Sequence, residues 1–159
     1  MIRPANPNDL DFVYDLYMHP QVNPYLLYEP MDKTAFAPIF HDLITSGIKY
    51  IYHDSTEDAG MFKLIPLAHR TSHIAYLGGL AIHPSHGGKG YGLRMLNEII
   101  EFAKSQSFLR VELSVATVNT KAIRLYEKAG FEKEGIYRKY TFLKSENRFL
   151  DEVVMSVVF

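Results

Sequence analysis

A glycine-rich segment that joins an apolar run to an amphipathic run is the feature that most constrains this chain. The apolar run Leu80-Ala81-Ile82 leads into Gly87-Gly88-Lys89-Gly90-Tyr91-Gly92-Leu93, and apolar residues at helical spacing follow. Glycine lets the backbone approach an anion closely, and the free amides at the start of a helix point toward such an anion. The segment therefore predicts a strand, a phosphate-binding loop and a helix in succession.

The spacing of the glycines argues against two common nucleotide motifs. A P-loop places Ser or Thr directly after its Gly-Lys pair, whereas Gly90 follows Lys89 in this chain. A dinucleotide-binding loop needs G-x-G-x-x-G, but its third glycine position is Leu93 here. Its acidic partner is also doubtful, because Glu112 falls inside a predicted strand. A hydride-transferring nucleotide enzyme is therefore disfavoured.

A second motif follows about thirty residues after the loop. The run Asn119-Thr120-Lys121-Ala122-Ile123-Arg124-Leu125-Tyr126-Glu127-Lys128-Ala129-Gly130-Phe131 fills every marked position of N-x-x-A-x-x-L-Y-x-x-x-G-F. With the loop, it resembles the GCN5-related N-acetyltransferases, and the close resemblance runs from Ile74 to Tyr140. One departure is Gly87, where the family has Arg or Gln. Lys89 and Arg94 are candidates to supply positive charge instead.

The resemblance implies acetyl-CoA as cosubstrate. The residues expected to bind it lie in the apolar strand, the loop and the second motif: Leu80, Ala81, Ile82, Gly88, Lys89, Gly90, Tyr91, Gly92, Leu93 and Asn119. In the family, the backbone of that strand pairs with pantetheine, and an N-H group polarises the thioester carbonyl. Gly78-Gly79 before the strand is consistent with a bulge that frees such groups.

Tyr126 matches the family's general acid. A tyrosine has an ordinary pKa of about 10, so it is protonated at neutral pH and can donate to a departing thiolate. The predicted proton acceptor is Glu112, which lies two residues from Ser114 on the same strand face. Some family members carry a glutamate at the position of Ser114. Glu29, His73 and a water relay remain alternatives for the base.

Tyr28 and Glu29 lie where the family's acceptor loop falls, and one carboxylate amid aromatic rings suits a cationic amine. Residues 131–155 also resemble the branch of polyamine, amino-acid and ribosomal-protein N-terminal acetyltransferases. The predicted reaction is direct acetyl transfer from acetyl-CoA to the primary amine of a small molecule or a peptide. A non-catalytic acyl-CoA-binding or sensing module is the alternative, and whether the protein forms a homodimer stays open.

Composition excludes several other classes. With 159 residues, 47% hydrophobic and 22% charged, the chain fits one globular domain over residues 1–159. A net charge of -1 argues against a nucleic-acid partner, and the absence of cysteine excludes disulfides and thiolate metal sites. No apolar run reaches the roughly 20 residues of a membrane span, so we expect a cytoplasmic protein without a membrane partner. His83 and His86 are expected to be solvated rather than to bind a metal.

The patterns of apolar residues predict a mixed α+β fold. The resemblance implies a three-layer arrangement, with a central splayed mixed sheet of about seven strands flanked by four helices. The expected elements are strands near 2–5, 49–53, 61–67, 74–82, 111–115, 135–143 and 149–159, and helices near 8–18, 32–45, 93–103 and 119–130.

Overall fold

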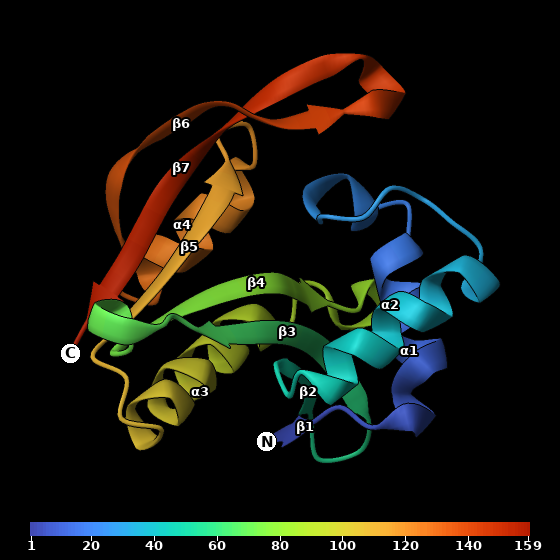
Figure 1. Ribbon diagram of the computed structural model, residues 1–159, viewed down its shortest axis with the longest axis horizontal. Coiled ribbons are helices and arrows are strands. Elements are labelled where there is room, and N and C mark those ends of the chain that lie inside the picture. The colour runs from blue at the N-terminus through green and yellow to red at the C-terminus, as the bar shows by residue number, and fades with distance from the viewer. The chain divides into compact units, whose positions relative to one another are not determined.

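A computed structural model describes residues 1–159 and contains one seven-stranded mixed sheet and four α-helices (Figure 1). The helices and strands have these bounds: β1 Ile2–Pro4, α1 Leu10–Met18, α2 Lys33–Thr45, β2 Lys49–His53, β3 Asp58–Pro66, β4 Ile74–Ile82, α3 Tyr91–Ser105, β5 Arg110–Ala116, α4 Thr120–Lys128, β6 Glu132–Leu143 and β7 Arg148–Val158. The strands follow the order β1-β2-β3-β4-β5-β7-β6. The predicted fold class is therefore confirmed, and the apolar strand β4 is central as expected.

The chain forms two compact units. The first comprises Met1–Leu64 and Gly79–Tyr91. In it, β2 pairs antiparallel with both β1 and β3, and α1 contacts α2. Its core is built from apolar side chains of α1, α2, β2 and β3, among them Val13, Leu16, Tyr17, Phe36, Phe40, Ile51 and Met61. These side chains give both helices an apolar face toward the interior of the unit.

Local sequence signals set the ends of both helices of this unit. The side chain of Asp32 accepts a hydrogen bond from the amide of Ala35 at 2.8 Å, and α2 begins at the next residue, Lys33. His19 follows α1 with an extended backbone because it precedes a proline. Gly47 has a φ of +67° just after α2, which is the conformation that glycine permits most easily.

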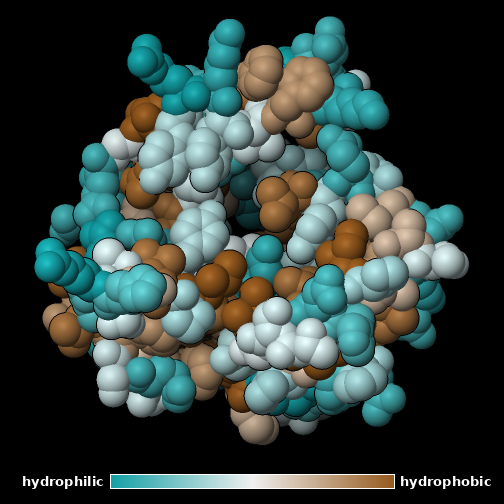
Figure 2. All heavy atoms as spheres, viewed as in Figure 1, coloured by the Kyte–Doolittle hydropathy of each residue, from teal (hydrophilic) through white to brown (hydrophobic).

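The second unit comprises Ile65–Gly78 and Gly92–Phe159. In it, β4 pairs in parallel with β5 from Ile74 to Tyr76, and β7 pairs antiparallel along the whole of β5. The strands β6 and β7 form a long hairpin (Figure 1). Figure 2 shows hydrophilic side chains around a small apolar group near the turn of this hairpin, where the half-exposed rings of Phe142 and Phe149 lie 4.9 Å apart.

The strand β5 has one apolar and one polar face. Val111, Leu113 and Val115 are buried, whereas the alternate side chains of Arg110, Glu112 and Ser114 are half-buried on the opposite face. This alternation places a row of polar groups beside β4 and β7.

None of the helices combines the length and the apolar character that a membrane span needs.

Candidate active site

The glycine loop adopts a backbone conformation that favours glycine at two positions. Gly88 and Gly90 each have a φ of +75°, and a Cβ atom on either would meet nothing within 4 Å. A left-handed residue on each side of Lys89 is the kind of geometry that turns backbone amides toward one centre, as in anion-binding nests. Because α3 begins at Tyr91, the free amides of its first turn follow directly. The loop therefore has the form that a pyrophosphate site needs.

Side chains around His86 hold this loop in place. The imidazole of His86 is only 6% exposed, and its Nε2 lies 3.1 Å from a carboxylate oxygen of Glu57. Its ring also contacts the ring of Tyr91, whose hydroxyl donates to Asp54 at 2.5 Å. The expectation of two solvated histidines is therefore wrong for His86, because its ring is buried where it anchors the loop.

The other two glycines of the loop have separate structural reasons. A Cβ atom at Gly87 would lie 3.1 Å from the carbonyl oxygen of Pro84, which accepts the Gly87 amide at 3.0 Å. This turn leaves little room for a side chain at Gly87, where the resemblance leads one to expect Arg or Gln. A Cβ atom at Gly92 would lie 2.9 Å from Leu125, so Gly92 allows α3 to approach α4 closely.

Tyr126 is held on α4 with its hydroxyl unpaired. The side chain of Asn119 accepts from the amide of Ala122 at 3.3 Å, which confirms the predicted start of this helix. The Tyr126 side chain is 9% exposed and packs against the ring of Phe131, yet its hydroxyl has no hydrogen-bond partner. Burial and, secondarily, Tyr76 raise the pKa of Tyr126. This phenol therefore keeps its proton at neutral pH and has it available to donate.

A series of hydrogen-bonded side chains crosses the polar face of β5. The Tyr76 hydroxyl and the Ser114 hydroxyl lie 3.2 Å apart, and Ser114 donates to one carboxylate oxygen of Glu152 at 2.6 Å. Thr141 donates to the other oxygen of Glu152. Ser114 is thus hydrogen-bonded to a carboxylate. The resemblance places a glutamate at the position of Ser114 in some family members.

Sequence reasoning missed Glu152. Glu152 and Ser114 are 38 residues apart, and only the register of β7 against β5 brings their side chains together. Glu152 and Ser156 lie four residues apart and so share one face of β7, but this spacing does not give the register against β5.

The predicted base, Glu112, is engaged in an ion pair. The Nε atom of Arg110 lies 3.0 Å from a carboxylate oxygen of Glu112, and the same guanidinium donates to Glu134 and to Ser156. Hydrogen bonds from Arg110 lower the pKa of Glu134 to about 2. Glu112 therefore lies on the same strand face as Ser114, as predicted, but shares a cation with a second carboxylate.

Of the predicted acceptor residues, Tyr28 is half-buried and Glu29 is exposed. The ring of Tyr28 packs edge-on against Tyr17, with ring centroids 5.1 Å apart, and also contacts Phe36. The Nζ atom of Lys63 lies 5.6 Å from the centre of the Tyr28 ring. The protein thus supplies its own cation to this ring, whereas Glu29 makes no ion pair.

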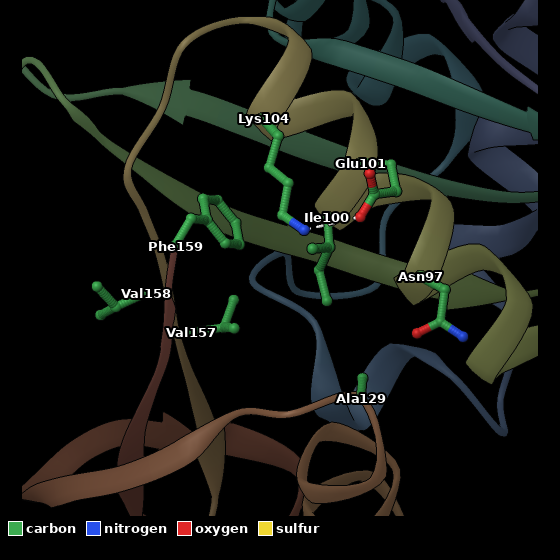
Figure 3. Close-up of a pocket in the computed structure, with 8 residues that line it drawn as sticks. All are labelled: Asn97, Ile100, Glu101, Lys104, Ala129, Val157, Val158 and Phe159. Atoms are coloured by element: carbon green, nitrogen blue, oxygen red, sulfur yellow. Dashed lines mark hydrogen bonds and ion pairs between the residues drawn. The ribbon is translucent and has the colours of Figure 1, made fainter.

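A separate open pocket of about 530 Å³ lies beside α3 in the second unit (Figure 3). Its lining combines helix residues with the end of the chain: Asn97, Ile100, Glu101, Lys104, Ala129, Val157, Val158 and Phe159. Lys104 donates to Glu101 at 2.8 Å and stands over the ring of Phe159, so the two charged groups of the pocket satisfy each other. None of the predicted site residues lines this pocket.

Known proteins resemble this chain in sequence and in fold. The sequence model described as the Acetyltransferase (GNAT) family matches residues 10–131. Spermidine N(1)-acetyltransferase of Vibrio cholerae is 26% identical over 84% of this chain and 79% of that protein. N-acetyltransferase aca1 of Schizosaccharomyces pombe is 32% identical over 77% of this chain and 56% of that protein. The crystal structure of V. cholerae spermidine N-acetyltransferase with CoA and spermine has a TM-score of 0.87 at 23% identity, covering 99% of this chain and 94% of that chain, so the two share a fold.

Proposed function

The chain belongs to the GNAT family of acetyltransferases, and on that premise we propose that it transfers the acetyl group of acetyl-CoA directly to a primary amine. The observation that carries this proposal is Tyr126, a buried tyrosine with an unpaired hydroxyl at the general-acid position of the family motif. Acetyl-CoA is the cosubstrate, and the acceptor is a small-molecule amine or a peptide amine.

The glycine loop and the strand before it are proposed to hold the cosubstrate. The amides around Gly88 and Gly90, with those at the start of α3, suit the pyrophosphate because they present donors at the positive end of a helix dipole. Backbone groups of Leu80, Ala81 and Ile82 are proposed to pair with pantetheine. Asn119, which caps α4 through its Oδ1, keeps its amide nitrogen for a contact to the ligand. When bound, acetyl-CoA supplies the activated thioester carbonyl.

Side chains of this protein are proposed to carry out the two proton transfers that acetyl transfer needs. Tyr126 donates its phenolic proton to the departing thiolate sulfur, and a base takes a proton from the attacking amine. Glu112 remains a proposed base. Glu152 is a second one, favoured by its hydrogen bond to Ser114, whose hydroxyl can pass the proton to the carboxylate and regain one from the amine.

The proposal is tested by measuring thiol release from acetyl-CoA with pools of polyamines, amino acids, aminoglycosides and peptide N-termini. The chain has no cysteine, so a thiol reagent sees no background from the protein. Release with one pool that Tyr126→Phe abolishes is the expected result. A protein that binds acetyl-CoA but releases thiol with none of the pools would instead favour a sensing module.

A further inference from the structure

Two buried lysines lie directly opposite one another in the first unit. Lys49 of β2 pairs in register with Lys63 of β3, so their side chains share one face of the sheet. Lys49 is 2% exposed and Lys63 is 7% exposed, and no carboxylate forms an ion pair with either. Like charges in directly opposed positions destabilise a sheet, and burial without a counter-ion adds to that cost. This arrangement therefore needs a reason beyond stability.

The two lysines and one tyrosine converge on Gly79. A Cβ atom at Gly79 would lie 2.7 Å from the hydroxyl oxygen of Tyr17, 3.3 Å from Cε of Lys63 and 3.5 Å from Nζ of Lys49. The ammonium of Lys49 donates to the Tyr17 hydroxyl at 3.0 Å. Gly79 itself has a φ of +54°. Three polar groups thus meet beside a strand position that has no side chain of its own.

The tyrosine rings beside the lysines replace a counter-ion only in part. The Lys49 ammonium lies 4.5 Å from the centre of the Tyr17 ring, and that of Lys63 lies 5.6 Å from the centre of the Tyr28 ring. Burial still lowers the pKa of both lysines, and the charge of Lys63 lowers that of Lys49 further. An anion bound between the two ammonium groups would reverse these effects, because it favours the charged form of each.

We propose that Lys49, Lys63 and the Tyr17 hydroxyl bind the carboxylate of the acceptor, so that the acceptor is an amino acid or a similar amine bearing a carboxylate. This assignment rests on the proposed acetyl transfer and names its substrate class. Gly79 lies within β4 and directly precedes Leu80, the first of the three β4 residues proposed to bind acetyl-CoA. In an α-amino acid the amine and the carboxylate share one carbon atom, so a carboxylate held at Gly79 keeps the amine close to that strand.

The same residues disfavour a polyamine. A polycation that entered this region would meet two lysines without an acidic partner, and the Tyr28 ring predicted to receive it already faces Lys63. Glu29, the carboxylate that the sequence predicts to bind a cationic amine, is exposed. The proposed acceptor class therefore differs from the spermidine for which the V. cholerae relative is named.

The test compares amino acids, the corresponding amino-acid amides and spermidine as acceptors in the thiol-release assay. Lys63→Met removes one charge while keeping a side chain of similar length, and Lys49→Met does the same at the second position. Lys128→Met, at an exposed lysine of α4, is the matched control. We expect each of the two lysine variants to raise the KM for the amino acid by at least about tenfold, to leave the amide nearly unchanged, and to behave differently from the control.

The outcomes separate this proposal from the acetyl transfer on which it rests. Turnover of spermidine but not of amino acids would overturn the proposed carboxylate contacts and leave the acetyl transfer standing. Should no amine release thiol, calorimetric titration of the wild type and Lys63→Met with the same amino acids decides the matter without turnover. Binding that Lys63→Met loses supports the proposed carboxylate contacts, and the absence of binding by every amino acid contradicts them.

Discussion

The Nζ atom of Lys49 lies 3.0 Å from the hydroxyl oxygen of Tyr17, and both side chains are almost completely buried. Burial disfavours the charged form of each group, so the pKa of Lys49 is well below and the pKa of Tyr17 is above its usual value. Burial therefore works against a charge on either group, and one hydrogen bond joins the two side chains. Recruiting an anion to this place therefore changes both protonation and stability.

Replacing Lys49 by methionine is expected to raise the free energy of unfolding at neutral pH by about 1 kcal/mol. The lost hydrogen bond to Tyr17 costs less than the burial of an ammonium without a counter-ion. Urea unfolding of the wild type, Lys49→Met and the exposed-site control Lys128→Met measures this effect. A variant less stable than the control would show that Lys49 is a structural contact and not a binding group.

The same variant should change how stability depends on pH. Between the lowered pKa of Lys49 and its usual value of 10.5, the unfolded chain binds more protons at this position than the folded chain, so wild-type stability rises with pH. The raised pKa of Tyr17 acts in the opposite direction only above about pH 10. The difference in unfolding free energy between wild type and Lys49→Met should therefore shrink as the pH increases toward 10. A difference that stays constant would mean that Lys49 does not titrate there.

Tyr126→Phe is expected to lower kcat by about 10² to 10⁴ while leaving the affinity for acetyl-CoA unchanged. The raised pKa of Tyr126 means that the wild type does not lose activity through this group below pH 10. Steady-state kinetics and equilibrium binding of acetyl-CoA give the two quantities. Tyr137→Phe, at an exposed tyrosine of β6, is the control. Equal rates for the two variants would remove Tyr126 from the mechanism.

The two proposed bases can be told apart by isosteric substitutions. Glu152→Gln should lower kcat by about 10², because it abolishes the carboxylate that Ser114 contacts. Glu112→Gln should lower kcat less, because Glu112 is engaged in an ion pair with Arg110. In that variant Arg110 also keeps its second carboxylate partner, Glu134. The reverse order of effects would return the role of base to Glu112.

The sequence predicts the parts of this site that depend on local patterns. Positive φ angles at Gly88 and Gly90, and the cap that Asn119 supplies to α4, follow from short-range rules about loops and helix ends. Contacts that depend on strand register could not be predicted. Lys49 and Lys63 look like ordinary polar positions of two strands, and only the antiparallel register makes them direct neighbours.

A matched pair of glycine substitutions tests the geometry around Gly79. Gly47 and Gly79 both have a positive φ, of +67° and +54°, so alanine at either should cost about 1 to 2 kcal/mol in backbone strain. A Cβ atom at Gly47 meets nothing within 4 Å, whereas at Gly79 it would lie 2.7 Å from the Tyr17 hydroxyl.

We therefore expect Gly79→Ala to be more destabilising than Gly47→Ala in urea unfolding, and to raise the KM for an amino-acid acceptor when Gly47→Ala does not. Equal losses of stability would show that the space beside Gly79 is larger than the structure indicates. Equal KM values would place the acceptor elsewhere. Because the backbone strain is common to both variants, the difference between them isolates the space in which Tyr17, Lys49 and Lys63 meet.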